Sequence, residues 1–333
     1  MSESVRDIDA VITWVDGNEP NHRKKWNQHK KENRNIDNEL LTGRDKTRFI
    51  NNGELKYCLS SIRKFAPWIR KIYVVTDDQI PEFVNEEFIS EHNLSIIDHK
   101  TIFKSYEWAL PTFNSRTLES MLWRIPDLST HFIYFNDDFV LTKPLYPSDF
   151  FYKDQVVLRG GWKKVRNYGA LRIKINEWVS AISKRALGIT RSMNLLLQIK
   201  SAKLAGYDKR YFKSPHVPHP MRKKTISDFF AANPLLLNEN IQYKFRNMDQ
   251  FSAVYLANHL EIKNNNVIFD TENDFVMING EMEIGMTFTS KLKKIINQDV
   301  SFLCIQGLES LTAEQQKELD LILSDLLGIK SIR

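Results

Sequence analysis

His131-Phe-Ile-Tyr-Phe-Asn-Asp-Asp138 is the stretch of this chain that decides its fold. The run from Phe132 to Phe135 is aromatic and β-branched and has no Gly or Pro, so it predicts a buried strand. Asn136, Asp137 and Asp138 follow directly. Ligands of open α/β sheets bind beyond the carboxyl ends of strands, where paired carboxylates can hold a hard divalent cation that bridges a diphosphate. An Asx turn that only closes the strand is the alternative, and these residues alone favour neither.

Strand and helix patterns alternate along the first half of the chain. Residues 9–16, 71–77 and 94–98 each predict a strand that ends at a carboxylate. Between them, apolar residues at helical spacing predict one helix that follows the N-cap Asn52 and ends before Pro67, and another that opens over 110–115 and ends before Pro126. This alternation predicts an α/β fold with a mostly parallel, Rossmann-like sheet and right-handed crossovers.

Two further helices are predicted in the second half of the chain. One runs from Met248 to about His259, on the helical spacing of its apolar residues. The other begins at a capping box, Thr312-Ala-Glu-Gln315, and continues through Leu327 to the closing residue Gly328.

Composition places the protein among ordinary globular chains, with 333 residues, 42% hydrophobic and 26% charged. Its two cysteines, Cys58 and Cys304, form no metal motif, and we expect both to be buried thiols in a reducing compartment. The N-terminal residues lack the apolar segment of a secretory signal, and no run approaches the length of a membrane span. We therefore expect a cytoplasmic protein, in peripheral contact with the inner face of the cytoplasmic membrane if it visits a membrane at all.

Positive charge is concentrated in the middle of the chain. The net charge is +6, but residues 151–224 hold 18 Lys and Arg against three acids, so this segment carries +15 and the rest of the chain −9. Such an uneven split indicates a surface that faces an anion. Within it, residues 151–213 interleave basic and aromatic side chains and predict a helical insertion, with a helix from Glu177 to Lys203. Sugar stacking, a membrane interface, single-stranded nucleic acid and a subdomain with solvated lysines all remain open.

The segment Ser214-Pro-His-Val-Pro-His-Pro220 presents two imidazoles three residues apart. Its prolines exclude a helical zinc pair of the H-E-x-x-H kind. A rigid, extended loop suits a general base or a phosphate ligand, so His216 and His219 are candidates for those roles. The alternative is that both histidines are structural.

Taken together, these motifs resemble the Stealth family, the hexose-1-phosphate transferases of bacterial capsule synthesis, which are related to the eukaryotic enzyme that adds GlcNAc-1-phosphate to lysosomal glycoproteins. The four blocks of the family are matched, in order, by residues 9–18, 48–138, 216–249 and 301–307. The second block is the most specific, and residues 151–213 match poorly. In the fourth block the family usually has Asn-Asp where this chain has Gln306-Gly307, so the role of that carboxylate is left unassigned.

The resemblance implies a glycosyltransferase-A-like fold and transfer of a sugar-1-phosphate from a UDP-sugar to a glycan hydroxyl, with release of UMP. It divides the chain into a nucleotide-sugar-binding α/β core over 1–150, an acceptor or membrane contact over 151–213 and the rest of the catalytic core over 214–333. Asp137 and Asp138 would hold Mg²⁺ or Mn²⁺, His216 or His219 would be the base, and Arg246 would neutralise the phosphoryl group. Asp9 would act at the catalytic centre, and Asp16 would meet the nucleotide or the metal. The remaining donor-site candidates are Trp14, Asn52, Gly53, Asn114, Ser115 and Arg124.

Two rival functions fit parts of the same sequence. A conventional glycosyltransferase would use the same fold and metal but release UDP, and the block that contains His216 and Arg246 argues for attack at phosphorus instead. A membrane or nucleic-acid-binding module would explain the basic segment, but it would not explain carboxylates at four strand ends. The expected partners are therefore a UDP-sugar donor, a glycan or capsule oligosaccharide acceptor and an anionic membrane surface, with no nucleic acid.

Overall fold

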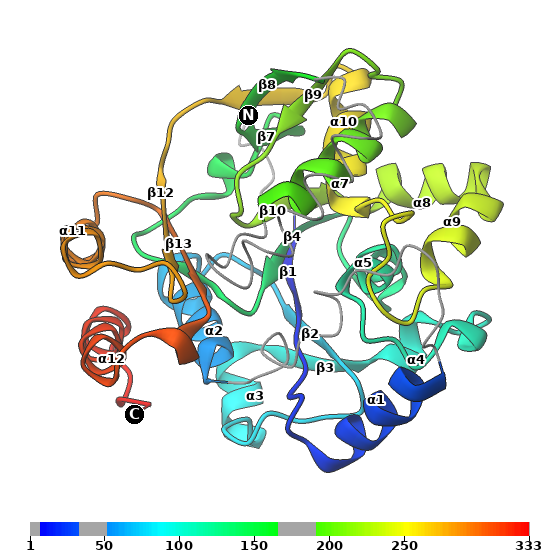
Figure 1. The fold of residues 1–333 in the computed structure, drawn as a ribbon. Helices are drawn as coiled ribbons and strands as arrows, with labels where there is room; N and C mark the ends of the chain where they lie inside the picture. Colours follow the sequence, from blue (N-terminus) through cyan, green and yellow to red (C-terminus); the bar gives the residue numbers. More distant parts are fainter. Residues whose placement is uncertain (1–6, 33–51, 166–190, 333) are drawn as a thin grey trace.

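The computed structural model describes residues 7–32, 52–165 and 191–332 of an α/β protein (Figure 1). Its central sheet has five strands in the order β10-β4-β1-β2-β3. Strands β4, β1, β2 and β3 are mutually parallel, and β10 is antiparallel to β4. This confirms the predicted α/β class and mostly parallel sheet. The strands are β1 (Ile8–Thr13), β2 (Ile72–Thr76), β3 (Leu94–Asp98), β4 (His131–Asn136) and β10 (His219–Arg222).

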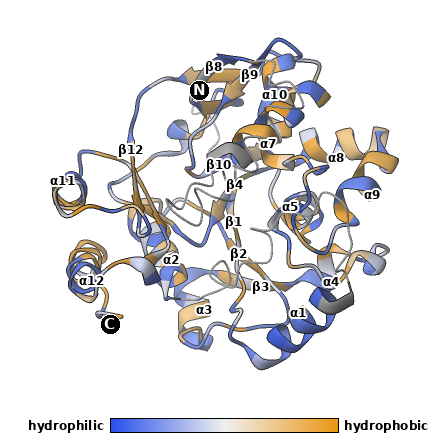
Figure 2. Ribbon diagram, viewed as in Figure 1, coloured by the Kyte–Doolittle hydropathy of each residue, from blue (hydrophilic) through white to orange (hydrophobic). Residues whose placement is uncertain are grey.

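The central strands are apolar because both faces of the sheet are covered. Ile12, Val74 and Phe135 lie in a core shared with α2 (Glu54–Phe65), α11 (Gly285–Ile296) and α12 (Ala313–Leu327). Alternate residues of the same strands, such as Val11 and Tyr134, lie in a second core. Figure 2 shows the contrast between the mostly hydrophobic central strands and the hydrophilic α1 (Pro20–Glu32). The second core is shared with α5 (Ser115–Glu119), α8 (Lys223–Ala232), α9 (Pro234–Ile241) and α10 (Ala253–Lys263).

Helix boundaries follow the local capping chemistry, and two helices begin later than predicted. The capping box of Thr312 and Gln315 and the left-handed Gly328 close α12 as predicted. Helix α2, however, begins after Gly53, whose φ of 89° suits glycine, and the expected N-cap Asn52 instead bonds to the Glu54 carboxylate. Helix α10 begins five residues later than predicted, because the Ser252 side chain accepts from a backbone N–H and caps it there.

The helix predicted to run up to Pro126 is interrupted. Helix α5 ends at Glu119, and a short 3₁₀ turn, η4 (Leu122–Arg124), follows. All the apolar residues of the pattern are buried as predicted, but the Ser120 hydroxyl donates to the Arg116 carbonyl four residues back. Such back-bonding bends or ends a helix, which explains the break.

Three small sheets flank the central one. Their orders are β11-β7-β6, β12-β13-β5 and β8-β9. The described part of 151–213 contains helix α7 (Arg191–Leu204) and also four strands that the prediction of a helical insertion missed; the rest of the helix predicted from Glu177 lies outside the described residues. The four missed strands are β6 to β9. The strands of the three small sheets are β5 (Phe139–Leu141), β6 (Phe151–Tyr152), β7 (Gln155–Arg159), β8 (Gly161–Lys164), β9 (Arg210–Lys213), β11 (Val267–Asp270), β12 (Phe275–Asn279) and β13 (Phe302–Gln306).

Short helices complete the described chain. They are α3 (Glu86–His92), α4 (His99–Ile102) and the 3₁₀ turns η3 (Glu107–Ala109), η5 (Pro147–Asp149) and η6 (Leu308–Ser310). Both cysteines are buried and free, as predicted. Among the described residues, no helix is both long and apolar enough to cross a membrane.

Candidate active site

The candidate site lies at the carboxyl edge of the central sheet, beside the adjacent strands β1 and β4. In the sheet, the strands that follow β1 in the chain, β2 and β3, lie on one side of the β1–β4 pair, and β10, which follows β4, lies on the other. Open α/β sheets bind ligands at such a point, where the strand order reverses. Strand β10 runs antiparallel to β4, with His219 opposite Tyr134 near the end of β4. The loop that precedes β10 therefore arrives at the same edge and carries His216 to the residues that follow β4.

His216 is the imidazole that faces the aspartates. Its Nε2 lies 3.2 Å from Nδ2 of Asn136 and 3.9 Å from Oδ2 of Asp138. The ring packs edge-on against Phe139, with the ring centroids 4.7 Å apart. With the Asn136 amide donating to Nε2, that nitrogen carries the lone pair of a neutral imidazole. Because the His216 side chain is 21% exposed, a substrate hydroxyl can reach it.

Asp138, which lies beside His216, also interacts with two further carboxylates, Asp137 and Glu54. Burial, followed by the charges of Asp138 and Glu54, raises the pKa of Asp137 well above its usual value. Burial also raises the pKa of Glu54, with a further contribution from Asp138. Oδ1 of Asp138 is buried and has no hydrogen-bond partner among the described residues. A divalent cation would relieve both the repulsion and the unmet hydrogen bond, so the residues present fit such an ion.

Arg246 lies on a loop that Asn114 holds in place, and its side chain contacts the first residue of α5. Its Nη2 donates to the Ser115 hydroxyl at 2.8 Å. The Asn114 amide nitrogen bonds to the carbonyls of Tyr243 and Phe245 and to Gln250, while its oxygen accepts from the Arg116 N–H. Asn114 is 1% exposed and its polar atoms are engaged within the protein, so its hydrogen bonds serve the local structure. It positions the loop of Arg246.

Glu119 is a candidate site residue that the sequence interpretation missed. It ends α5, accepts from the Ser252 hydroxyl at 2.7 Å and interacts electrostatically with Arg116 and His216. Burial raises its pKa to about 7, an effect that the hydrogen bond from Ser252 and the electrostatic interactions with Arg116 and His216 only partly offset. The available signal was its spacing of four from Ser115, which puts both residues on one helix face. Glu54 was also missed, because a carboxylate in the first turn of a helix is already explained by its favourable interaction with the helix dipole.

Several expected site residues lie elsewhere or are buried. Asp9 is near the amino end of β1, level with Phe132, which is four residues or about 13 Å before Asn136 along the strand. It accepts from Arg70 and the Ser129 N–H, a pairing that ties the start of β1 to neighbouring segments. Arg124 donates to the Lys104 carbonyl, and its guanidinium lies over the rings of Tyr106 and Trp123.

The end of β1 contributes less than expected. Trp14 is 5% exposed and packs into the first core, so it supports the strand end from within. Asp16 lies at the carboxyl edge, where Oδ1 accepts from the Asn18 N–H in an Asx turn and the backbone N–H donates to Gln79. Asn52 donates to Glu54 and Glu309 at the start of α2, and Gly53 lies against Ile332.

The carboxylates that end β2 and β3 are already engaged. Burial opposes ionisation of Asp77, but hydrogen bonds from His22 and Lys25 outweigh it and hold the pKa of Asp77 well below its usual value. Asp98 caps α4 by accepting from the Lys100 N–H through Oδ1, while its Oδ2 is buried without a hydrogen-bond partner among the described residues. What distinguishes the carboxylates after β4 is that Asp138 lies beside His216.

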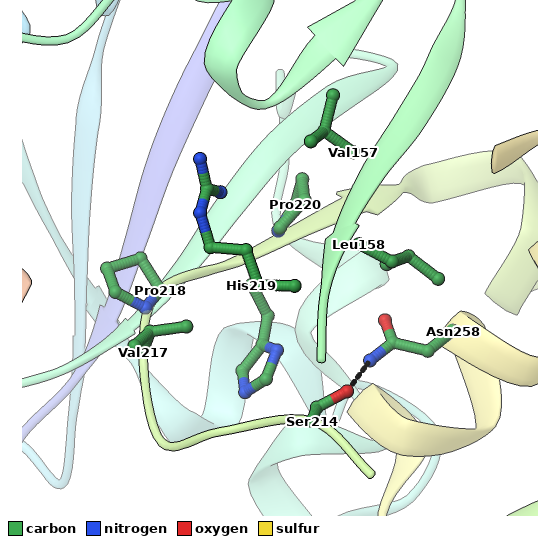
Figure 3. A pocket seen from close by; sticks show the side chains of 9 residues that line it. Val157, Leu158, Ser214, Val217, Pro218, His219, Pro220 and Asn258 are labelled. Atoms are coloured by element: carbon green, nitrogen blue, oxygen red, sulfur yellow. Dashed lines mark hydrogen bonds between the residues drawn. The ribbon is translucent and has the colours of Figure 1, made fainter. Parts of the chain in front are cut away.

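His219 differs from His216 although only two residues separate them. It is 6% exposed, and burial, reinforced by the charge of His216, lowers its pKa to about 3. Figure 3 shows its ring in a small cavity beside Ser214 and Asn258, which are hydrogen-bonded to each other at 3.1 Å. The cavity, of about 10 Å³, has room for roughly one water molecule and none for a sugar.

Comparison with known proteins identifies two conserved regions. Residues 6–31 match Stealth protein CR1, conserved region 1, and residues 48–158 match Stealth protein CR2, conserved region 2. The chain is 30% identical over 267 residues to the capsular polysaccharide phosphotransferase WcwK of Streptococcus pneumoniae, covering 72% of this chain and 74% of that protein. It is 29% identical to the exopolysaccharide phosphotransferase cps2G of Lactiplantibacillus plantarum, covering 87% and 83%. A Streptomyces coelicolor exopolysaccharide phosphotransferase is 44% identical over 144 residues, which are 43% of this chain and only 25% of that protein.

Solved structures show a weaker likeness. Core-mannan synthase A of Aspergillus fumigatus, in its Mn/GDP form, has a TM-score of 0.40 at 9% identity and covers 81% of this chain and 74% of that one. Staphylococcus aureus TarS in complex with UDP has a TM-score of 0.34 at 11% identity, covering 96% and 70%. Similarities at this level support no conclusion about chemistry.

Proposed function

This chain belongs to the Stealth family, and from that premise we propose that it transfers a sugar-1-phosphate from a UDP-sugar to a hydroxyl of a capsular or other cell-surface glycan. The hydroxyl oxygen attacks the phosphorus that carries the sugar, and the bond from that phosphorus to the bridging oxygen breaks. UMP leaves, and a phosphodiester joins the two sugars. The observation that supports this most is the meeting of His216 with Asp138, whose Oδ1 has no hydrogen-bond partner among the described residues, at the switch point of the sheet.

His216 is the proposed general base. Its side chain is partly open to solvent, and the Asn136 amide next to Nε2 orients the ring. An imidazole suits this task because its usual pKa, about 6.5, is near the working pH. The proton taken from the acceptor hydroxyl moves to Nε2, where Oδ2 of Asp138 at 3.9 Å stabilises the imidazolium that forms.

Asp137 and Asp138 are the proposed ligands of Mg²⁺ or Mn²⁺. The raised pKa of Asp137 and the unmet Oδ1 of Asp138 are what a cation would relieve. Such an ion supplies positive charge that neutralises the diphosphate and stabilises the leaving UMP. Glu54 lies close enough to add a third negative charge.

Arg246 is the proposed cationic partner of the transferred phosphoryl group. The Ser115 hydroxyl and the loop anchored by Asn114 fix its position, and a guanidinium can bond two phosphoryl oxygens at once. Asp16, Asn52, Gly53 and Ser115 remain the proposed donor-side residues. Asp9, Asn114 and Arg124 are no longer among them.

The division of the chain into three parts is also part of the proposal. Residues 1–150 and 214–333 would form the catalytic core, and residues 151–213 would contact the acceptor or an anionic membrane surface. Lys163 and Lys164, exposed on β8, belong to this basic segment, while Arg166 lies outside the described residues. A phosphate-bearing acceptor would explain the excess of positive charge there.

The released nucleotide decides between this reaction and a glycosyl transfer. The purified protein is incubated with UDP-sugars, Mg²⁺ and capsule oligosaccharides, and nucleotides are separated by chromatography. We expect UMP in a one-to-one ratio with a product whose ³¹P signal couples to protons of two sugars. UDP as the stoichiometric product would overturn the proposal in favour of a conventional glycosyltransferase.

The base is tested by comparing the two histidines. We expect His216→Ala to lower kcat by about 10²–10⁴, with a smaller change in KM, and to remove the ascending limb of the pH–rate profile near neutrality. His219→Ala is the matched control, because its imidazole is neutral and enclosed, and we expect the limb to persist. Loss of the limb in the His219 variant alone would show that the wrong imidazole was chosen.

A further inference from the structure

Three side chains from distant parts of the chain form a mixed nitrogen, oxygen and sulfur cluster, which we call the thiol cluster: Asp138, His216 and Cys304. One potential ligand atom of each lies within 4.8 Å of the others. Strand β13 pairs with β5 so that Cys304 lies opposite Phe139, next to Asp138, and the Ile305 N–H donates to the Asp138 carbonyl. The fold therefore fixes the thiol beside the carboxylate.

The spacing of the donor atoms fits a tetrahedral ion. Cys304 Sγ lies 3.5 Å and His216 Nε2 lies 3.9 Å from Asp138 Oδ2. In a tetrahedral site with ligand bonds of about 2.0–2.3 Å, donor atoms are separated by roughly 3.3–3.8 Å. The three side chains therefore need only small movements to share one ion. Because His216 and Asp138 are each about one-fifth exposed, the ion has a path from solvent.

The donor set favours a thiophilic cation over Mg²⁺. Thiolate and imidazole are preferred ligands of Zn²⁺ and Co²⁺, whereas Mg²⁺ prefers oxygen. A bound ion displaces the thiol proton to solvent, so a thiolate and a carboxylate together balance its double charge. The buried, unpartnered Oδ1 of Asp138 is a second oxygen donor at the same place.

We propose that the thiol cluster binds Zn²⁺ or a similar thiophilic ion, and that this binding inhibits the phosphotransfer. The inhibition rests on the proposed function, because the ion takes the lone pair of His216 and the carboxylate of Asp138. The proposed base and one proposed Mg²⁺ ligand are then both occupied.

Cobalt binding tests the site without reference to activity. Co²⁺ is added to the purified full-length protein, and the near-ultraviolet sulfur-to-cobalt charge-transfer band is recorded. We expect one equivalent to bind with this band, and Cys304→Ser to abolish the band. Cys58→Ser is the matched control, because Cys58 is equally buried but outside the cluster, and we expect the band to remain. Absence of the band in the wild type, or its persistence in Cys304→Ser, would overturn the proposal.

His216→Ala keeps the test decisive if Cys304 variants fail to fold. His216 lies on a partly exposed loop, so its truncation leaves the strand pairing of β13 intact. We expect cobalt to bind at least about tenfold more weakly, since losing even a hydrogen-bond partner of a metal ligand costs 10–100-fold. Unchanged cobalt affinity in this variant would contradict the proposed ligand set.

Zinc titration in the transfer assay tests the inhibition. Each rate is compared with the zinc-free rate of the same variant, in the presence of Mg²⁺. We expect Cys304→Ser to need at least about tenfold more Zn²⁺ than Cys58→Ser for half inhibition. Equal sensitivity of the two variants would overturn the inhibitory role. A cobalt band in a protein that transfers no sugar phosphate would instead overturn the proposed function and leave the metal site standing.

Discussion

The β1–β4 pair has aspartates at both ends, and their surroundings differ: Asp9 is fully buried, whereas Asp137 and Asp138 are partly exposed. At the amino end, Asp9 is 0% exposed and accepts from Arg70 at 2.6 and 2.9 Å and from the Ser129 N–H. At the carboxyl end, no Lys or Arg of the described residues is paired with Asp138, whose neighbours are His216 and the Cys304 thiol, and burial and the nearby acids raise the pKa of Asp137. A carboxylate held by an arginine ties elements together, whereas acids crowded at one place favour a cationic ligand. The same residue type thus supports stability at one end and, in our proposal, chemistry at the other.

The largest expected effect is at the carboxyl end. We expect Asp137→Asn and Asp138→Asn each to reduce kcat by about 10²–10³ or more, because a charge that acts in the transition state is lost. EDTA should reproduce the loss in the wild type, and Mg²⁺ or Mn²⁺ should reverse it. Full activity in EDTA would show that these carboxylates only shape a turn.

The stability of the Asp137→Asn variant should not fall together with its activity. With the pKa of Asp137 raised on folding, the folded protein binds a proton more tightly there, so stability falls as pH rises above the unfolded value of 3.8. At pH 7 we therefore expect Asp137→Asn to unfold at no lower urea concentration than the wild type. Mg²⁺ should raise the unfolding midpoint of the wild type but not of the variant.

At the amino end we expect a loss of stability and not of chemistry. Arg70→Ala leaves Asp9 buried without its cation, which should cost about 3 kcal/mol of unfolding free energy. The kcat of the folded fraction should change little, because the pair is about 13 Å from Asn136 along the strand. Urea unfolding and kcat are measured on one preparation. A large fall in kcat with unchanged stability would erase the contrast between the two ends.

Glu119 should give a smaller, pH-dependent effect. Its pKa rises from 4.5 to about 7 on folding, chiefly through burial, so the folded state holds an extra proton between these values. Stability should therefore fall by up to about 3 kcal/mol as pH rises from 4.5 to 7, and Glu119→Gln should remove that dependence. Urea unfolding at pH 5 and pH 8 checks this, with Glu318→Gln on the exposed face of α12 as the control. A wild type that is equally stable at both pH values would contradict the assignment.

The smallest effect is expected in the basic segment. Reversing the charge of Lys163 or Lys164 removes an exposed attraction worth about 1 kcal/mol or less, so the acceptor KM should rise by a few-fold. Donor affinity should stay unchanged, and the salt dependence should flatten, because exposed charges are screened over about 8–10 Å. Lost liposome binding with an unchanged acceptor KM would make the segment a membrane contact, and no change in either would make these lysines a solvated face.

Local chemistry explains why parts of the fold could be predicted. The strand before Asn136 is apolar because helices cover both faces, and a parallel sheet leaves that pattern in the sequence. The capping box at Thr312 is a contact between neighbours in the chain, so it too can be read directly. The break after Glu119 could not be predicted, because it depends on the Ser120 hydroxyl donating to a carbonyl of the same helix and not to another acceptor.

The sequence by itself determined the fold class, the strand ends where carboxylates gather and the family motifs that include Asp137, Asp138, His216 and Arg246. Only the tertiary structure decided which of those side chains meet. Asp9 lies on β1 and Asp138 in the turn that follows β4, and the parallel register of these two strands places them at opposite edges of the sheet. Cys304 lies next to Asp138, and Glu119 interacts electrostatically with His216. In both cases the two residues are more than 90 positions apart in the chain. Local patterns cannot encode such partners, because they are selected by how strands pair and helices pack.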